Sequence, residues 1–150
     1  MKTRNIVSLE HFIEASRDAG YTNIATALAE LVDNAFEAEA NSVRIDVEIS
    51  DEAEISVSIQ DDGHGMTPTI LELALQFGGT TRFNSRAGAG RYGMGLPNSS
   101  LSQARRVDVV TWRSPRAAWK SYLDVDEIAA GDLKSIPKPR RTTPNAKTQT

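Results

Sequence analysis

The sequence predicts an α/β domain built from helices and antiparallel β-hairpins. Two observations carry this prediction: an apolar stripe with helical spacing over residues 23–38, and two alternating runs, VRIDVEIS and EISVSIQ, separated by a short link. A chain of 150 residues can bury one sizeable core, whereas two complete domains would not fit. We therefore expect a single globular unit.

Start and stop signals place the helices. Ser8 and Gly20 are residue types that begin and end helices, so a short helix is expected between them. Thr67 and Pro68 predict the start of a second short helix, through LELALQF, and Pro97 predicts another that runs to about residue 104. The long helix over about 23–38 rests on apolar residues four and three positions apart: Ile24, Leu28, Leu31, Ala35 and Ala38.

The remaining segments are a loop, two strands and a tail. Residues 76–95 are rich in glycine and lack an apolar repeat, which predicts a long mobile loop. RVDVVTW and AAWKSYLDV predict two more strands separated by a turn. From Lys134 onward there is little to bury, so we expect residues 134–150 to be a disordered tail and residues 1–133 to be the domain.

Charge and composition narrow the class of protein. A net charge of -3 argues against a chain whose main role is to neutralise nucleic-acid phosphates, although DNA stays open as a partner through a local basic patch. The absence of cysteine excludes disulfides and thiolate metal sites. With no apolar segment of membrane-spanning length, the chain is expected to be cytoplasmic and to have no membrane partner.

The long helix carries a pair of polar residues that suits phosphate chemistry. Within AELVDNAFEAEA, Glu30 and Asn34 are four positions apart and are therefore neighbours on one helix face. A carboxylate can act as general base toward water, and an amide oxygen one turn along can ligate Mg²⁺. A solvated helix face is the competing interpretation.

The string DDGHGM follows the second alternating run. Gly63 and Gly65 would let the backbone approach a flat ligand closely, and the carboxylate of Asp61 could accept a hydrogen bond from an exocyclic amine such as that of adenine. An ordinary turn after a strand is the alternative. His64 is given no role.

The segment GAGRYGMGLPNSS leads four glycines into the start of a predicted helix. Free amide groups and the helix dipole favour a phosphate at such a start. A merely flexible loop would have the same composition, because glycine strings of this kind are weak signals when they stand alone.

Taken together, ELVDNAFEAEA, DDGHGM and GRYGMGL resemble, in order and spacing, the three N-terminal nucleotide motifs of the GHKL ATPase superfamily. This superfamily includes gyrase, the ninety-kilodalton heat-shock chaperone, histidine kinases, MutL and MORC proteins. The match covers about residues 24–112 and is most similar to the MutL and MORC branches. It implies the Bergerat fold, an α/β (α+β) two-layer sandwich with a mixed, mostly antiparallel sheet, helices on one face and a mobile ATP lid.

The resemblance also implies roles for individual residues. Glu30 would be the general base, Asn34 the Mg²⁺ ligand and Asp61 the partner of the adenine amine, giving magnesium-dependent ATP binding and hydrolysis. Residues 77–91 correspond to the ATP lid, whose closure would promote ATP-dependent dimerisation within a larger assembly. The other implied nucleotide contacts are Gly63, Gly65, Met66, Thr80, Thr81, Gly90, Arg91, Tyr92, Gly93, Met94, Gly95 and Leu96.

The sequence departs from the family pattern in two places. Pro97 and Asn98 stand where some relatives have a phosphate-binding lysine or a serine. No clear Gly-Thr strand follows residue 112, and a second domain that would supply a catalytic lysine is missing, so weak turnover is expected without a partner. Two alternatives stay open: a nucleotide sensor that does not hydrolyse ATP, and a histidine kinase, for which His11 is a poor phosphoacceptor.

Overall fold

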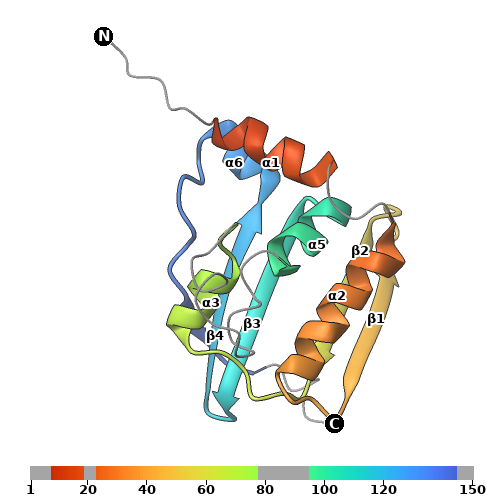
Figure 1. Ribbon diagram of the computed structural model, residues 1–150, viewed down its shortest axis with the longest axis vertical. Coiled ribbons are helices and arrows are strands. Elements are labelled where there is room, and N and C mark those ends of the chain that lie inside the picture. Colours follow the sequence, from red (N-terminus) through yellow and green to blue (C-terminus); the bar gives the residue numbers. More distant parts are fainter. Residues whose placement is uncertain (1–7, 19–22, 78–94, 145–150) are drawn as a thin grey trace.

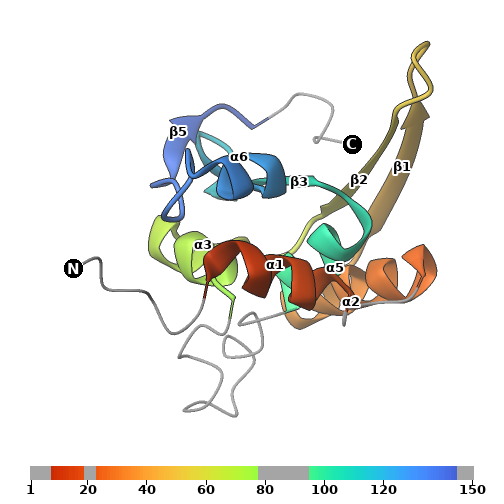
Figure 2. The same ribbon diagram turned by 90° about the horizontal axis from the view of Figure 1, so that it is seen from above.

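The computed structural model describes residues 8–18, 23–77 and 95–144. Its elements form two layers, with a row of helices on one side and the strands on the other (Figures 1 and 2). The helices of this row are α1 (Leu9–Asp18), α2 (Ile24–Glu37), α3 (Pro68–Ala74) and α5 (Gly95–Gln103). The α/β sandwich expected from the sequence is confirmed.

The long helix α2 has well-defined ends. The side chain of Asn23 caps its start by accepting a hydrogen bond from the backbone nitrogen of Thr26, at 2.9 Å. At the other end, the backbone nitrogen of Ala38 donates to the carbonyl oxygen of Asn34, at 3.0 Å. The helix therefore places Glu30 in its middle and Asn34 in its last turn.

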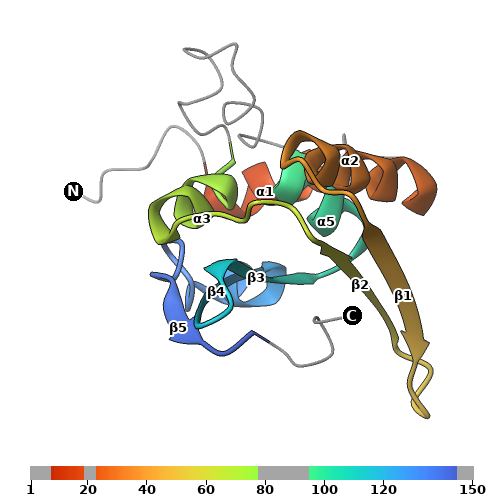
Figure 3. The same ribbon diagram turned by 90° about the horizontal axis from the view of Figure 1, so that it is seen from below.

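The strands β1 (Val43–Ile49) and β2 (Ile55–Asp61) form the expected antiparallel hairpin. Ile45 lies opposite Ile59 and Val47 opposite Val57, so the apolar residues of both strands share one face. The hairpin ends at Asp61, which delivers the chain into the DDGHGM loop. Figures 2 and 3 show its other end projecting away from the helix layer.

The second sheet comprises β3 (Arg106–Ser114), β4 (Ala117–Asp124) and β5 (Arg140–Thr142), all antiparallel, with β4 in the centre. In the described ranges, no strand pairing joins this sheet to the β1–β2 hairpin. The two sheets together make the strand layer.

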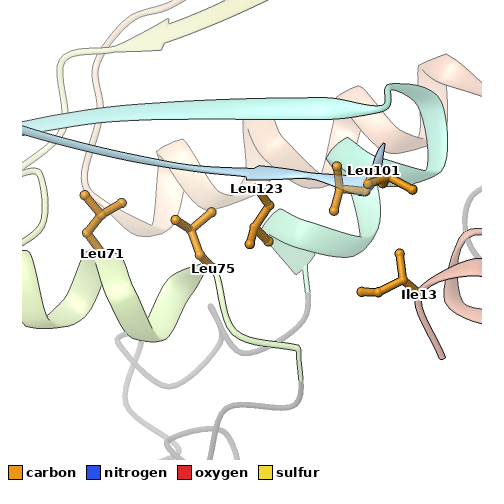
Figure 4. Packing of buried hydrophobic residues seen from close by; sticks show 6 residues of the cluster. Ile13, Leu71, Leu75, Leu101 and Leu123 are labelled. Carbon is orange, nitrogen blue, oxygen red and sulfur yellow. The ribbon is translucent and has the colours of Figure 1, made fainter. Parts of the chain in front are cut away.

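The core lies between the helices and the second sheet (Figure 4). Leu71 and Leu75 enter it from the α3 segment and are completely buried. The rest of the buried cluster comes from α1, α5, β4 and α6: Ile13, Leu101, Leu123 and Val125. Burying each such side chain stabilises the fold by about 1.5–3 kcal/mol. The core thereby fixes α5 and β3, the elements that flank the loops of interest.

Helix α1 lies across the helix layer and contacts two other segments. The ring of Phe12 meets that of Phe77 edge-on, with centroids 5.9 Å apart. The Nε atom of Arg17 donates to the carbonyl oxygen of Leu101, at 2.6 Å, and so satisfies a carbonyl near the end of α5.

The structure contains a short helix that the sequence did not indicate, α6 (Val125–Ala130). The carboxylate of Asp124 accepts hydrogen bonds from the backbone nitrogens of Asp126 and Glu127, at 2.9 and 3.1 Å, and Gly131 ends the helix with a φ of 79°. Six residues are too few for an apolar repeat, so only these caps could have revealed it.

The expectation of a disordered tail over residues 134–150 is wrong for part of that range. Strand β5 pairs with β4, with Arg141 opposite Trp119. The hydroxyl of Ser121 also donates to the carbonyl oxygen of Pro137, at 2.6 Å. Backbone pairing and the packing of Ile136 against the core hold this segment. A composition poor in apolar residues reveals neither contact.

A second difference concerns the start of α5. The helix begins at Gly95, two positions before Pro97. Proline is tolerated in the first turn, because the backbone nitrogens there have no intrahelical acceptor. The helix therefore continues through Pro97 without a break.

Candidate functional site

The candidate site begins where α2 packs against the start of α5. Glu30 on α2 lies directly against Gly95, the first residue of α5: a Cβ added at Gly95 would collide with Oε1 of Glu30 and lie 3.2 Å from its Cδ. Gly95 is buried. The absence of a side chain at this position therefore lets the carboxylate reach the N-terminal end of α5, where backbone nitrogens lack intrahelical acceptors.

Two half-buried amide side chains on the same pair of helices each contain a buried polar atom. Within the described residues, the Nδ2 atom of Asn34 on α2 and the Oδ1 atom of Asn98 on α5 are buried without a hydrogen-bond partner. Buried polar groups are normally paired, so such atoms point to a ligand, an ion or water. The amide of Asn34 can be turned to present its oxygen, which makes it a suitable ligand for a hard cation.

The DDGHGM loop starts at the end of β2 and is ordered by its own first residue. The backbone nitrogen of Gly63 donates to Oδ1 of Asp61, at 2.8 Å. This bond fixes the orientation of the carboxylate, which can still accept a hydrogen bond at its other oxygen. Asp61 is half-buried, so the interaction is partly shielded from water.

The end of α2 contacts the same loop. The backbone nitrogen of His64 donates to the carbonyl oxygen of Ala38, at 2.9 Å. A Cβ at Gly63 would lie only 2.7 Å from that oxygen and 2.8 Å from the Cβ of Ala38. Gly63 therefore allows the loop to lie close against the end of α2, a contact with the protein itself rather than the approach to a flat ligand that the sequence predicts.

On its other side, the loop contacts β3. The backbone nitrogen of Met66 donates to Oγ1 of Thr111, at 2.7 Å. Gly65 has a φ of 68°, and a Cβ there would collide with the carbonyl oxygen of Trp112. Any other residue at Gly65 would be strained in its backbone and would clash with β3.

The predicted residues are thus placed as follows. The structure brings Glu30 against Gly95, and it places Asp61, Gly63, Gly65 and Met66 in one loop that contacts the end of α2. Leu96 packs against the apolar core. The remaining predicted contacts lie outside the described residues: Thr80, Thr81, Gly90, Arg91, Tyr92, Gly93 and Met94.

Sequence reasoning missed three residues that shape the loop. Asp62 accepts hydrogen bonds at Oδ1 from the backbone nitrogens of Asn41 and Ser42, at 2.7 and 2.9 Å. Ala38 and Thr111 hold the loop from opposite sides. A short carboxylate or hydroxyl gives no local signal of a bond to a backbone 20 or 45 positions away.

Comparison with known families decides the class of this site. Residues 21–149 match the model of the histidine kinase-, DNA gyrase B- and HSP90-like ATPases. The chain belongs to this family. The match includes α2, the DDGHGM loop and α5, so the resemblance expected from the three motifs is confirmed, and family membership supports ATP binding.

Individual relatives of this ATPase family include MORC and MutL proteins. ATPase morc-1 of Caenorhabditis elegans is 36% identical over 87 residues, which is 57% of this chain and 10% of that protein. MORC family CW-type zinc finger protein 3 of Mus musculus is 33% identical over 91 residues, or 57% of this chain and 9% of that protein. DNA mismatch repair protein MutL of Rhizorhabdus wittichii is 31% identical over 116 residues, or 75% of this chain.

The chain spans about a tenth to a fifth of the length of these curated relatives. The residues that the structure describes contain no helix long and apolar enough to cross a membrane. They also contain no group of three or more histidine, cysteine, aspartate and glutamate side chains arranged to hold a metal ion.

Proposed function

We propose that this chain binds ATP with Mg²⁺ and hydrolyses it slowly, with the phosphates near the start of α5 and adenine at the DDGHGM loop. The observation that carries the proposal is the approach of Glu30 to Gly95. A carboxylate beside a helix start is well placed to act on water next to an anion bound there, because the helix end favours negative charge. Family membership supplies the nucleotide class.

The proposed reaction is an in-line attack of water on the terminal phosphorus of ATP. Glu30 would accept a proton from this water as the new oxygen–phosphorus bond forms and the bond to ADP breaks. The backbone nitrogens at the start of α5 would stabilise the charge that develops on the phosphate oxygens. Asp61 would hold the base and leave the phosphates free to reach α5.

Asn34 is the residue that would hold Mg²⁺. Its buried side-chain nitrogen has no hydrogen-bond partner in the described ranges, and it lies one turn beyond Glu30 on the same helix. One protein oxygen is a sufficient contribution when phosphates and water complete the shell. When bound, Mg²⁺ would neutralise charge on the phosphate oxygens. Asn34 would also place that charge one turn from Glu30.

The chain alone is expected to bind ATP yet turn it over slowly. The proposed groups suffice for adenine, Mg²⁺ and part of the phosphates, but among the described residues none of them is a cation directed at the terminal phosphate. Loss of one donor to the developing charge typically lowers the rate by about 10² to 10³, while ground-state binding can survive. Phosphate release should be measured beside equilibrium binding on one preparation. Turnover of about 1 s⁻¹ or faster would contradict this expectation.

We also propose that residues 77–91 form a lid that orders over bound nucleotide, an idea supported by their glycines and missing apolar repeat. Trypsin should cut at Arg82 or Arg86 in the free protein, and a non-hydrolysable ATP analogue should slow these cuts. Cleavage at Arg113 and Arg116, which are exposed around the β3–β4 turn, serves as the internal control. Equal cleavage in both states at all four sites would argue against a lid.

Closure of this lid is proposed to promote pairing with a second copy or with a further domain that supplies the missing cation. The small share of the relatives' length that the chain spans supports the idea of a larger assembly. Sedimentation velocity with and without the same ATP analogue tests pairing. An unchanged monomer at saturating analogue would exclude nucleotide-dependent self-association of this chain.

A further inference from the structure

We propose that Thr111 is a positioning residue for recognition of the nucleotide base, an inference that rests on the proposed function. Thr111 lies on β3, outside all three sequence motifs, and it is only 5% exposed. Its hydroxyl oxygen accepts the hydrogen bond from the backbone nitrogen of Met66, at 2.7 Å. No other residue of β3 bonds the DDGHGM loop through its side chain among the described hydrogen bonds.

The position of Thr111 explains why this contact matters for Asp61. The loop leaves β2 at Asp61 and is held at His64 by the carbonyl oxygen of Ala38, at 2.9 Å. Thr111 holds the opposite end, at Met66. A loop fixed at both ends has fewer conformations, so the carboxylate of Asp61 stays oriented before the ligand arrives.

Close packing around Gly65 leaves the loop little room to shift. The Oγ1 atom of Thr111 lies 3.3 Å from the place that a Cβ on Gly65 would occupy, and the carbonyl carbon of Trp112 lies 2.8 Å from it. Figure 3 shows the segment that carries this loop leading from the end of β2 across to α3. Removal of the Thr111 hydroxyl would leave the nitrogen of Met66 without its acceptor, and the loop would have to move to satisfy it.

Strand β3 directly follows α5, the helix whose start is proposed to face the phosphates. Strand β3 therefore continues from the helix proposed to face the phosphates, and through Thr111 it also holds the loop proposed to bind the base. We therefore infer that Thr111 sets the spacing between Asp61 and α5, and with it the preference for adenine over guanine, which carries a carbonyl where adenine carries its amine.

The test compares Thr111→Val, which keeps the shape and removes the acceptor, with Thr111→Ser, which keeps the acceptor. Ser121→Ala is the matched control: Ser121 is also 5% exposed, lies on β4 and loses a hydrogen bond to a backbone carbonyl, but it does not contact the loop. ATP and GTP affinities, thermal unfolding and hydrogen exchange at the amide of Met66 are measured for each protein.

Thr111→Val should weaken ATP binding by about tenfold, as expected for a buried donor left unpaired. It should also narrow the preference for ATP over GTP and speed exchange at Met66. Thr111→Ser should restore all three, and Ser121→Ala should lower stability without changing the preference. If Thr111→Val does not fold, Thr111→Cys replaces it with the same expected direction, since sulfur is a weak acceptor.

Three results would overturn the inference. If the Val variant loses stability like Ser121→Ala but keeps the ATP preference, Thr111 only supports the fold. If exchange at Met66 is unchanged, the hydroxyl does not hold the loop. If the unsubstituted protein binds neither nucleotide, the proposed function itself fails. Binding measured on the unsubstituted protein alone distinguishes this outcome from the first two.

Discussion

Replacement of Glu30 by glutamine is expected to lower ATP hydrolysis by about 100-fold or more, while ATP affinity stays nearly unchanged. Glutamine fills the same space against Gly95 but cannot accept a proton from water. The loss of a positioned general base costs about 10² to 10⁴ in rate. Single-turnover hydrolysis and calorimetric ATP binding, measured on the same variant, separate the two effects.

A matched control for this change is Glu54→Gln, at the exposed end of the β1–β2 hairpin, far along the chain from α5. This variant should hydrolyse ATP at the rate of the unsubstituted protein. Equal rates for Glu30→Gln and the unsubstituted protein would exclude Glu30 as the base. ATP binding without single-turnover hydrolysis by the unsubstituted protein would favour the nucleotide sensor that does not hydrolyse ATP.

Replacement of Asp61 by asparagine is expected to weaken ATP binding by about 1–3 kcal/mol, or roughly 5- to 150-fold. The carboxylate offers two oxygens, and Oδ1 already accepts from the backbone nitrogen of Gly63, at 2.8 Å. Asparagine has a single oxygen for Gly63 and the adenine amine together, and its own amino group would face a donor. Isothermal titration of ATP measures the loss.

The neighbouring Asp62→Asn is the control for Asp61, because it changes charge by the same amount in the next position. Asp62 uses Oδ1 for the backbone nitrogens of Asn41 and Ser42, and asparagine keeps an oxygen for this role. ATP affinity should therefore change little. If both variants weaken ATP binding equally, loop charge is responsible, and Asp61 does not recognise the base.

The parts of the fold that could be predicted are those with a repeating apolar pattern or a strong cap. The stripe from Ile24 to Ala38 predicts α2 because its spacing matches one helix face, and the alternation around Val47 and Val57 predicts the hairpin because each side chain alternates in direction. Helix α6 and strand β5 lack such patterns, since a short cap and backbone pairing hold them.

The candidate site also contains residues with a local sequence pattern and contacts without one. Glu30, Asn34 and the glycines could be proposed as site residues from the sequence, because each belongs to a compact motif whose residues lie near one another in the chain. The contact between Glu30 and Gly95 depends on how α2 packs on α5, and the bond between Met66 and Thr111 joins residues 45 positions apart. Neither spacing nor composition reveals a contact that only tertiary packing creates.

Titration of the purified chain with labelled ATP, with and without Mg²⁺, tests the central claim most directly. The proposed site predicts saturable binding of one ATP per chain, tighter when Mg²⁺ is present because Asn34 would then have its cation. Unlabelled ATP should displace the label. A folded preparation that shows no saturable ATP binding under either condition would contradict the account.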